Sequence, residues 1–574
     1  MSASNSTTSQ STQNRVLQAS YQPSENFYES DKALQHLLKK ELQEATLEQL
    51  QTYLQYTGKQ AAGKMNPLSL QADKQGPVLV KRDFLGNTIN KVDFHPAYEA
   101  LKDIAVQSGM FHLKWNPKER QKWEQERHRV GFATGSLYAM SESGLYCPLC
   151  MTDGAARLVA KYCTPEDQAR LLPHIATTNV EELYTGAMFL TEKAGGSDVG
   201  ANLVTATPIE GQEGYYHLNG EKWFCSNVNA EIIFALARTH PEVAGTRGLS
   251  IFLIEKTRPD GSPNPLEIVR LKDKLGVRSM ASAECLLQDT WGKLIGEEQQ
   301  GFKIMTDMIN LSRLYNSVAA MGGLRRALIE SYQFLNHRVT FGKNALEHPL
   351  VRTKVEELGA LHWANFYMTW RSIRALDLAD NGNKEEAALL RLLTPMLKRS
   401  TAATSVYVTR EAMELMGGMG YIEDGVLPKI MRDMMVLPIW EGAGNIMLLD
   451  MLRASFKSQG LTQMLQEIHQ QFNKIEETHQ KNTLLEALKE LENLLPALQE
   501  ASPAVMQATA KPAFEALTQL YQIACLIEYK DEESKEWIDP ALAYFVHLYQ
   551  QKQLCLQEPI AVETLHQLLA WEVE

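Results

Sequence analysis

The sequence predicts a mainly α-helical protein with a central β domain, because the spacing of apolar residues changes twice along the chain. Its 574 residues are too many for one hydrophobic core. Apolar residues first recur at three- and four-residue intervals, then alternate with polar ones, and then return to the helical interval. We expect five parts: a disordered tail (1–28), an N-terminal helical domain (29–185), a small β-barrel domain (186–295), a four-helix bundle (296–455) and an extra C-terminal helical domain (456–574).

The predicted tail is polar and almost uncharged. Its first residues, "MSASNSTTSQSTQNR", are mostly Ser, Thr, Asn and Gln, and Arg15 is the only basic residue before Lys32. This composition lacks the apolar core of a secretory signal and the basic residues of a mitochondrial presequence. No apolar run is long enough to span a membrane. Seven scattered cysteines suit a reducing compartment, so the sequence predicts a cytoplasmic protein.

The N-terminal domain has helical spacing, as in "DKALQHLLKKELQEATLEQLQTYLQ". The stretch "LVKRDFLGNTINKVDFHP" interrupts it with short extended segments around a Gly-Asn turn. Later, "CPLC" places Cys147 and Cys150 in a C-x-x-C pattern, but no second Cys or His pair follows at zinc spacing. We expect two core or pocket-wall cysteines, with a redox or metal role as the alternative, and we expect no metal site.

The β domain shows alternation and turn residues. "GYYHLNGEKWFCSNVNAEIIFALART" alternates, and its Asn219-Gly220 pair is typical of a tight hairpin turn. "RGLSIFLIEK" and "EIVRLKDKLGVRSMASAECLLQD" are further strand candidates. Several short strands within about 110 residues therefore predict a small sheet or barrel between the helical regions.

Long helices are expected in the rest of the chain. Three long stretches with helical spacing follow residue 300 and predict a bundle. The C-terminal domain carries a leucine stripe on one helical face, which we interpret as a packing face: Leu484, Leu488, Leu491, Leu495 and Leu498. From Phe456 onward there are 8 Lys, no Arg and 18 Asp plus Glu, so its formal charge is 8 − 18 = −10. A phosphate-binding surface would need the opposite sign.

Two stretches of the β domain could hold a planar cofactor. In "MFLTEKAGGSDVG" the glycines permit close backbone approach, while Thr191 and Ser197 offer hydroxyl groups. In "NGEKWFCSN", Phe224 and Ser226 share one face of a strand, where a ring could stack and a hydroxyl could hydrogen-bond. The ordinary alternatives are a turn for the first stretch and a barrel core for the second.

Two stretches of the bundle also combine polar residues with helix-breaking ones. In "HRVTFGKN", Arg338 lies near Phe341-Gly342, which is either a phosphate-binding corner or a basic helix end. "MGGMGYIEDGVLPKIMRDMMVLPIWEGAGNIM" breaks the helical pattern at Gly417-Gly418 and again around Glu441. Glycine inside a helix costs roughly 1 kcal/mol relative to alanine, so a lone carboxylate among glycines indicates a special turn.

The order of these motifs resembles the acyl-CoA dehydrogenase family. A helical domain is followed by T-E-x-x-x-G-S-D-V, G-x-K-x-F-x-S-N, R-x-x-F-G, G-G-x-G-Y and W-E-G, from about residue 80 to 455. "TEKAGGSDV", "RLKDKLGVRS", "DFHPAY" and "LPKIMRDMMVLPIWEGAGNIM" look like the AidB-like branch, as does a helical domain after the bundle. The resemblance implies an FAD-dependent enzyme that oxidises an acyl-CoA to a 2-enoyl-CoA.

Within this resemblance, Glu441 matches the general base that removes the α-proton of the thioester while hydride leaves the β-carbon for flavin N5. A carboxylate in an apolar pocket has a raised pKa and is a better base. We expect Gly442 and Gly444 to let the backbone approach the flavin and the thioester closely, and Trp440 to form a wall of the slot between them.

The resemblance also implies which other residues contact the ligands. Ser197, Arg313 and Glu441 match residues that contact the substrate. The residues that match FAD contacts are Met188, Leu190, Thr191, Ser197, Phe224, Ser226, Arg338, Phe341, Gly417, Gly418 and Asn445.

The resemblance further implies partners. Relatives pass electrons to an electron-transfer flavoprotein and form homotetramers, as dimers of dimers, with FAD at subunit boundaries. Two other functions stay open: a flavoprotein that binds DNA during alkylation stress, and a protein that sequesters acyl-CoA with little turnover. The negative charge of the C-terminal domain favours an acyl-CoA enzyme or binder over a DNA-binding protein.

Overall fold

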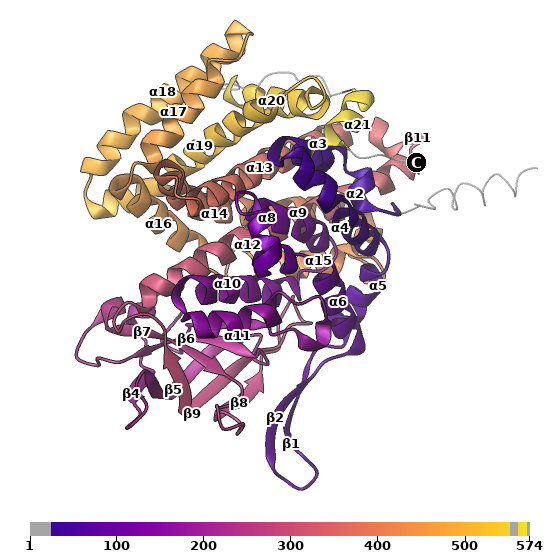
Figure 1. Cartoon of the computed structure of the whole chain (residues 1–574). Helices are drawn as coiled ribbons and strands as arrows, with labels where there is room; N and C mark the ends of the chain where they lie inside the picture. Colours follow the sequence, from indigo (N-terminus) through magenta and orange to yellow (C-terminus); the bar gives the residue numbers. More distant parts are fainter. Residues whose placement is uncertain (1–23, 551–560, 571–574) are drawn as a thin grey trace, which may run out of the picture.

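The computed structural model describes residues 24–550 and 561–570. Its β domain lies at one end of the molecule, and the helices that precede and follow it in sequence pack together beyond it (Figure 1). Residues 1–23 of the predicted tail lie outside the described residues. Its last residues are described, and helix α2 (Phe27–Ser30) buries Phe27 and Tyr28. Their aromatic side chains have a core to pack against, so the tail boundary predicted at residue 28 is too late.

The N-terminal region is helical, with one long hairpin. Strands β1 (Val78–Arg82) and β2 (Thr88–Asp93) pair antiparallel around the expected turn, where Gly86 has a φ of +88°. The hairpin extends away from the helices (Figure 1). These helices are α3 (Lys32–Glu41), α4 (Glu44–Ala62), α5 (Met65–Lys74), α6 (Pro96–Gln107), α7 (His112–Trp115), α8 (Pro117–Lys122), α9 (Arg127–Ala139), α10 (Tyr146–Tyr162) and α11 (Pro165–Ile175).

The central β domain is a small closed barrel. Its strands are β3 (Gly186–Phe189), β4 (Thr205–Pro208), β5 (Tyr215–Ser226), β6 (Ile232–Arg238), β7 (Leu249–Glu255), β8 (Leu266–Leu271) and β9 (Ser282–Leu294). Strand β6 pairs with β4 and β7, and β9 pairs with β5 and β7, so β4, β5, β9, β7 and β6 form a ring. β3 and β8 add to this ring, and the barrel has its own apolar core.

The hairpin turn predicted at Asn219-Gly220 is wrong, because both residues lie inside strand β5. The pairing of β5 with β9 shifts by one position between Leu218 and Gly220, and Gly220 has a φ of +138°. A Cβ at Gly220 would lie 2.8 Å from the side chain of Val204. Gly220 therefore lies at a β-bulge and close to Val204. A β-bulge favours the same residue types as a tight turn.

The bundle follows the barrel and provides the long helices of the molecule. They are α12 (Gly301–His337), α13 (Pro349–Asp380), α14 (Lys384–Leu415), α15 (Leu427–Met434) and α16 (Gly444–Lys457). Short strands β10 (Val339–Thr340) and β11 (Lys343–Asn344) separate α12 from α13. The buried face of this bundle belongs to one apolar cluster that also includes residues of the N-terminal and C-terminal helices.

The C-terminal helices cover the outer side of the bundle (Figure 1). They are α17 (Gly460–Phe472), α18 (Thr478–Glu500), α19 (Pro503–Tyr529), α20 (Lys535–Gln550) and α21 (Val562–Leu569), and α19, α20 and α21 pack against α13. All five leucines of the predicted stripe on α18 are buried, so the packing interpretation is confirmed. Among the described residues, none of the helices is long and apolar enough to cross a membrane.

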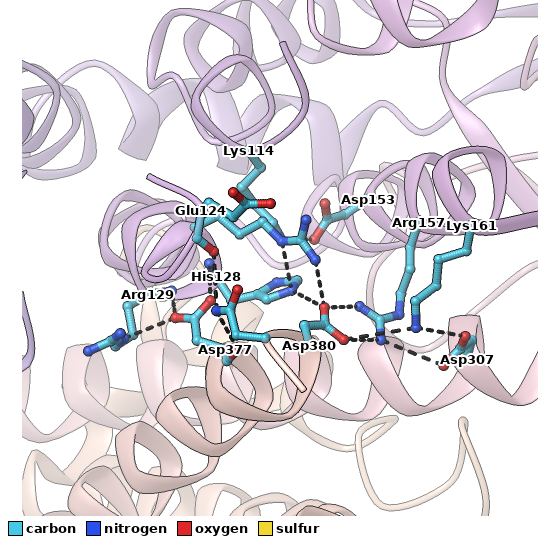
Figure 2. Close-up of polar contacts among 12 residues, drawn as sticks. Lys114, Glu124, His128, Arg129, Asp153, Arg157, Lys161, Asp307, Asp377 and Asp380 are labelled. Carbon is cyan, nitrogen blue, oxygen red and sulfur yellow. Dashed lines mark hydrogen bonds and ion pairs between the residues drawn. The ribbon is translucent and has the colours of Figure 1, made fainter. Parts of the chain in front are cut away.

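A buried ionic network joins the N-terminal helices to the bundle (Figure 2). Asp380, at the end of α13, accepts hydrogen bonds from Arg157 Nη1 at 2.6 Å, Arg127 Nη2 at 2.8 Å and His128 Nε2 at 2.9 Å. Asp377 accepts the backbone N–H of His128 at 2.8 Å, near the start of α9. The two arginines compensate the buried charge of Asp380, and the bonds to both carboxylates fix α9 and α10 against α13.

Candidate active site

The predicted base lies in the turn between α15 and α16. Glu441 has a φ of +55° and Gly442 a φ of +103°, so two successive residues adopt left-handed backbone conformations. For a residue with a side chain this conformation is strained, and such strain is typical of functional sites. Position 442 thus favours glycine, because glycine adopts this left-handed conformation without steric cost. Gly444 begins α16 without a positive φ, and a Cβ there would meet no atom of the described residues within 4 Å. The close approach of this backbone to the flavin and the thioester stays a prediction.

Two cationic side chains, one of them fully buried, hold the backbone of this turn. Arg313 Nε donates to the Glu441 carbonyl at 3.1 Å, and Lys398 Nζ donates to the Gly442 carbonyl at 2.7 Å. Arg313 is held in turn by Asp450, whose Oδ2 accepts from Nη1 at 2.8 Å. These charge-assisted bonds come from α12 and α14, and they stabilise the strained backbone at the carboxylate. Arg313 therefore lies beside the base, as the sequence predicted.

The carboxylate of Glu441 is held in a poorly solvated environment. Desolvation raises its pKa above the ordinary value, although a hydrogen bond with Ser312 and the charges of Arg313 and Lys398 oppose the shift. Burial also lowers the pKa of Lys398 to about 8, against the attraction of Glu441. A carboxylate with a raised pKa is better matched to proton abstraction near neutral pH than an exposed one.

A small cavity adjoins this carboxylate and lies between α10, α12 and the turn. Trp440 lines it, as predicted, and its Nε1 donates to Asn316 Oδ1. Cys147 and Cys150 also line it, so their interpretation as wall residues is confirmed. Burial raises the pKa of both thiols, which keeps them protonated and poorly reactive. The lining residues are Ser143, Tyr146, Cys147, Cys150, Ser312, Tyr315, Asn316, Ala319, Leu437, Trp440 and Glu441.

The barrel loop that carries Lys274 contacts the chain next to this cavity, because Ser279 Oγ donates to Glu142 Oε1 at 3.1 Å and Ser143 lines the cavity. Lys274 Nζ donates to Ser282 Oγ at 3.3 Å, and Ser282 Oγ lies 3.0 Å from Ser226 Oγ. Burial lowers the pKa of Lys274 to about 8. Ser226, Ser282 and Lys274 thus form one hydrogen-bonded group on the barrel.

The predicted cofactor residues of the barrel lie on neighbouring segments. Phe224 is 57% exposed, an unusual state for a phenylalanine on a barrel strand. The backbone N–H of Trp223 donates to the Thr191 carbonyl at 2.9 Å, which places the 188–191 segment beside β5. Met188 lies on β3, Leu190 accepts a bond from Asn202 at 2.7 Å, and Ser197 is exposed. The Phe224 ring thus lies largely in solvent next to a polar loop, with Lys272 Nζ 4.9 Å from its centre.

The other predicted cofactor residues lie on the surface, and none of them lines the cavity. Phe341 is 97% exposed with a φ of +49°, and Arg338 lies at the end of α12. Gly417, Gly418 and Asn445 also lie outside the cavity, and a Cβ at either glycine would meet no atom within 4 Å. Within the described residues of this single chain, these five therefore lack the neighbours that a complete cofactor site would require.

Sequence reasoning missed several polar residues of the site: Ser312, Asn316, Lys398 and Asp450. Ser312 and Asn316 are one helical turn apart on α12, and Arg313 follows Ser312 directly. Residues one turn apart lie on the same face of a helix. The predicted position of Arg313 on a helix near the site was therefore the signal that could have identified Ser312 and Asn316. Lys398 and Asp450 had no comparable signal, because they reach the turn from α14 and α16 only in the folded chain.

Comparisons with known proteins agree with this architecture. Residues 18–182 match the description "Adaptive response protein AidB N-terminal domain". Residues 187–290 match "Acyl-CoA dehydrogenase, middle domain", and residues 299–456 match "Acyl-CoA dehydrogenase, C-terminal domain". The three matches follow one another along the chain in the order that the motifs predicted.

Individual relatives cover most of the chain. Acyl-CoA dehydrogenase family member 11 of Caenorhabditis elegans is 30% identical over 75% of this chain and 70% of its own length. The putative acyl-CoA dehydrogenase AidB of Escherichia coli is 33% identical over 69% of this chain and 72% of its own. The crystal structure of C. elegans ACDH-11 with C11-CoA superposes with a TM-score of 0.84 at 26% identity, covering 97% of this chain and 95% of that one. The chain belongs to the acyl-CoA dehydrogenase family of oxidoreductases, in its AidB-like branch.

Proposed function

We propose that this protein oxidises an acyl-CoA to a 2-enoyl-CoA, with Glu441 as the base that removes the α-proton. The observation that carries the proposal is the carboxylate itself, which adjoins a cavity and has a raised pKa and a strained, cation-held backbone. Such a fixed and poorly solvated carboxylate is suited to proton abstraction next to a carbonyl. That C. elegans ACDH-11 was crystallised with C11-CoA supports an acyl-CoA ligand.

The residues of the barrel fit FAD as the cofactor. A largely exposed aromatic ring beside a polar loop is suited to stacking on a flat partner, and Phe224 is such a ring. Ser226, within hydrogen-bonding reach of Ser282, would hold the flavin edge, and Thr191, Ser197 and the Met188 and Leu190 backbone would line its ring. When bound, FAD supplies the hydride acceptor for the substrate β-carbon. An electron-transfer flavoprotein is the proposed final acceptor.

The surface residues fit an assembly in which neighbouring subunits complete the cofactor site. Arg338, Phe341, Gly417, Gly418 and Asn445 would then hold FAD across a subunit boundary. Other apolar side chains near them in sequence are exposed as well, and exposed apolar patches often mark interfaces: Val339, Leu350, Met419, Tyr421 and Ile422. We propose a homotetramer built as a dimer of dimers.

DNA binding is less well supported. The C-terminal residues from Phe456 onward carry a formal charge of −10, from 8 Lys and 18 Asp plus Glu, and this repels a phosphate backbone. Acyl-CoA sequestration uses the same cavity and differs from the proposed oxidation only in turnover. Retardation of DNA at modest salt, abolished by neutralising a surface Lys or Arg cluster, would instead support the DNA-binding function.

Glu441→Gln provides the decisive test of the base. The wild-type protein should be yellow and should lose its flavin absorbance when mixed anaerobically with its acyl-CoA. Because glutamine cannot accept the α-proton, Glu441→Gln should keep its flavin and bleach at least about a thousandfold more slowly, within the range that one positioned acid–base group contributes. The wild-type rate should rise with pH through the raised pKa of Glu441, since only the ionised carboxylate is a base.

The exposed Glu213 on a barrel loop provides the matched control, and Glu213→Gln should bleach like the wild type. Bleaching of Glu441→Gln at the wild-type rate would refute the role of this residue. A yellow wild-type protein that binds acyl-CoA without any bleaching would instead identify a sequestering protein.

A further inference from the structure

The cavity beside Glu441 contains a hydrogen-bond donor without a partner. Asn316 is 5% exposed, and its Nδ2 is buried with no hydrogen-bond partner among the described residues. Trp440 Nε1 can only donate, so the Asn316 oxygen must face it and the Asn316 amino group is left over. An unpaired buried donor costs about 1 to 3 kcal/mol, so a cavity for a purely apolar chain would not be expected to keep one.

The position of Asn316 relates this donor to the reacting end of a substrate. Ser312, which hydrogen-bonds the Glu441 carboxylate, lies four residues earlier on α12. An α-helix rises about 6 Å over four residues, and both side chains line the same cavity. A ligand whose α-carbon lies at Glu441 would therefore meet the Asn316 amide a few carbons further along its acyl chain.

The wall next to Asn316 is held by a buried ion pair. The ring of Tyr315 packs 5.3 Å from that of Tyr146, and Lys114 Nζ lies 5.8 Å from the centre of the Tyr315 ring. Asp153 accepts from Lys114 and Trp115, and all three are buried. Moving Tyr315 aside for a long chain would disturb a buried ion pair, which is costly.

We infer that the substrate is a short acyl-CoA whose chain carries an oxygen acceptor beyond the β-carbon, and that Asn316 Nδ2 binds this oxygen. The inference rests on the proposed function and specifies its substrate class. An apolar chain of the same shape would leave the amide unpaired, so the site discriminates by its unsatisfied donor rather than by size alone. Asn316 is thus a specificity-determining residue.

Two shape-matched ligands test the inference: 5-oxohexanoyl-CoA, which has a ketone oxygen, and 5-methylhexanoyl-CoA, which has a methyl group in its place. Dissociation constants are measured by calorimetry on Glu441→Gln holoenzyme, so that turnover does not interfere. We expect the ketone to bind about tenfold more tightly, the effect of one buried hydrogen bond. Undecanoyl-CoA should bind more weakly than either short ligand.

Two variants made in the Glu441→Gln background distinguish the role of the Asn316 donor from that of the Asn316 oxygen, which binds Trp440. Asn316→Leu keeps the volume and removes both polar atoms, whereas Asn316→Asp keeps an acceptor for Trp440 and removes only the donor. Both should lose the tenfold preference for the ketone. Equal binding of the two short ligands by the parent protein, or a preference that survives in both variants, would overturn the inference, as would tighter binding of undecanoyl-CoA.

This outcome is independent of the test of the proposed function. If Glu441 is not the base, flavin reduction by wild-type and Glu441→Gln protein will be equal whatever the ligand preference. If the base is correct but the substrate class is wrong, acyl-CoA will still bleach the wild-type flavin, and only the ketone preference will be missing.

Discussion

At the residue scale, the site depends on how one strained turn is held. Glu441 adopts a left-handed conformation that residues with side chains rarely use, and the next carbonyl is bound by Lys398 at 2.7 Å. Such strain persists only where surrounding contacts compensate for it. Lys398 also lowers the pKa of Glu441 through its charge, so one side chain acts on both the geometry and the basicity of the carboxylate.

Replacing Lys398 should therefore change the pH profile as well as the rate. In Lys398→Met, loss of the charge should move the midpoint of the pH dependence of anaerobic flavin reduction to higher pH. Loss of the bond to Gly442 should slow reduction roughly tenfold, equivalent to about 1.4 kcal/mol. Lys398→Arg keeps the charge and should retain the wild-type midpoint. A slower Lys398→Met protein with an unshifted midpoint would assign Lys398 a structural role alone.

At the element scale, helix α18 shows how a stripe of apolar residues attaches the C-terminal domain. Its predicted leucines are all buried, whereas Leu494, one position before a member of the stripe, is 38% exposed. Side chains one position apart on a helix point about 100° apart, so neighbours can differ completely in burial. The stripe itself, and not the leucine content of the helix, determines the packing of α18.

Substitution within this helix should separate the two kinds of leucine. Leu488→Ala removes a fully buried side chain and should destabilise the C-terminal helices by about 2 to 5 kcal/mol. Leu494→Ala should change stability by about 0.5 kcal/mol or less, because much of its side chain is already in water. Denaturant midpoints measured by circular dichroism provide the comparison. Equal effects of the two substitutions would contradict the packing of α18.

At the scale of the whole molecule, the network around Asp380 joins helices that are far apart in sequence (Figure 2). Burial opposes ionisation of Asp380, but its hydrogen bonds with His128 and Arg157 outweigh this and hold its pKa well below the usual range. Burial and the charge of Lys114 lower the pKa of His128 to about 3, so this histidine is neutral in the folded protein near neutral pH.

This neutral histidine makes stability depend on pH. Below about pH 6.5, the ordinary pKa of histidine, the unfolded chain takes up a proton that folded His128 refuses. His128 should therefore lower stability by up to about 1.4 kcal/mol per pH unit as the pH drops from about 6.5 towards about 4. Asp377 opposes this decline below about pH 6, because burial raises its pKa to about 6, and Asp380 contributes only below its ordinary pKa. His128→Gln should flatten the decline of the urea midpoint over this range. The exposed control His479→Gln should decline like the wild type, and an unchanged slope in His128→Gln would contradict the assignment.

Some features of the fold could be predicted because they are local. The change from helical to alternating spacing identified the barrel, and the leucine stripe identified the packing face of α18. Prediction failed at Asn219-Gly220, where a β-bulge and a hairpin turn favour the same residues. Only the strand partners of β5 distinguish the two, and those partners come from other parts of the chain.

The same division holds at the site. The sequence by itself determined the family, singled out Glu441 as the candidate base and predicted Trp440 as a wall residue, because each inference rests on short motifs whose residues are adjacent in the chain. For Cys147 it left core and pocket wall open. Only the tertiary structure decided what surrounds that carboxylate. Lys398 comes from α14, Arg313 and the unpaired amide of Asn316 come from α12, and Cys150 comes from α10. Burial and charge depend on which distant side chains meet, so the pKa of Glu441 and the polarity of its cavity emerge only when the helices pack.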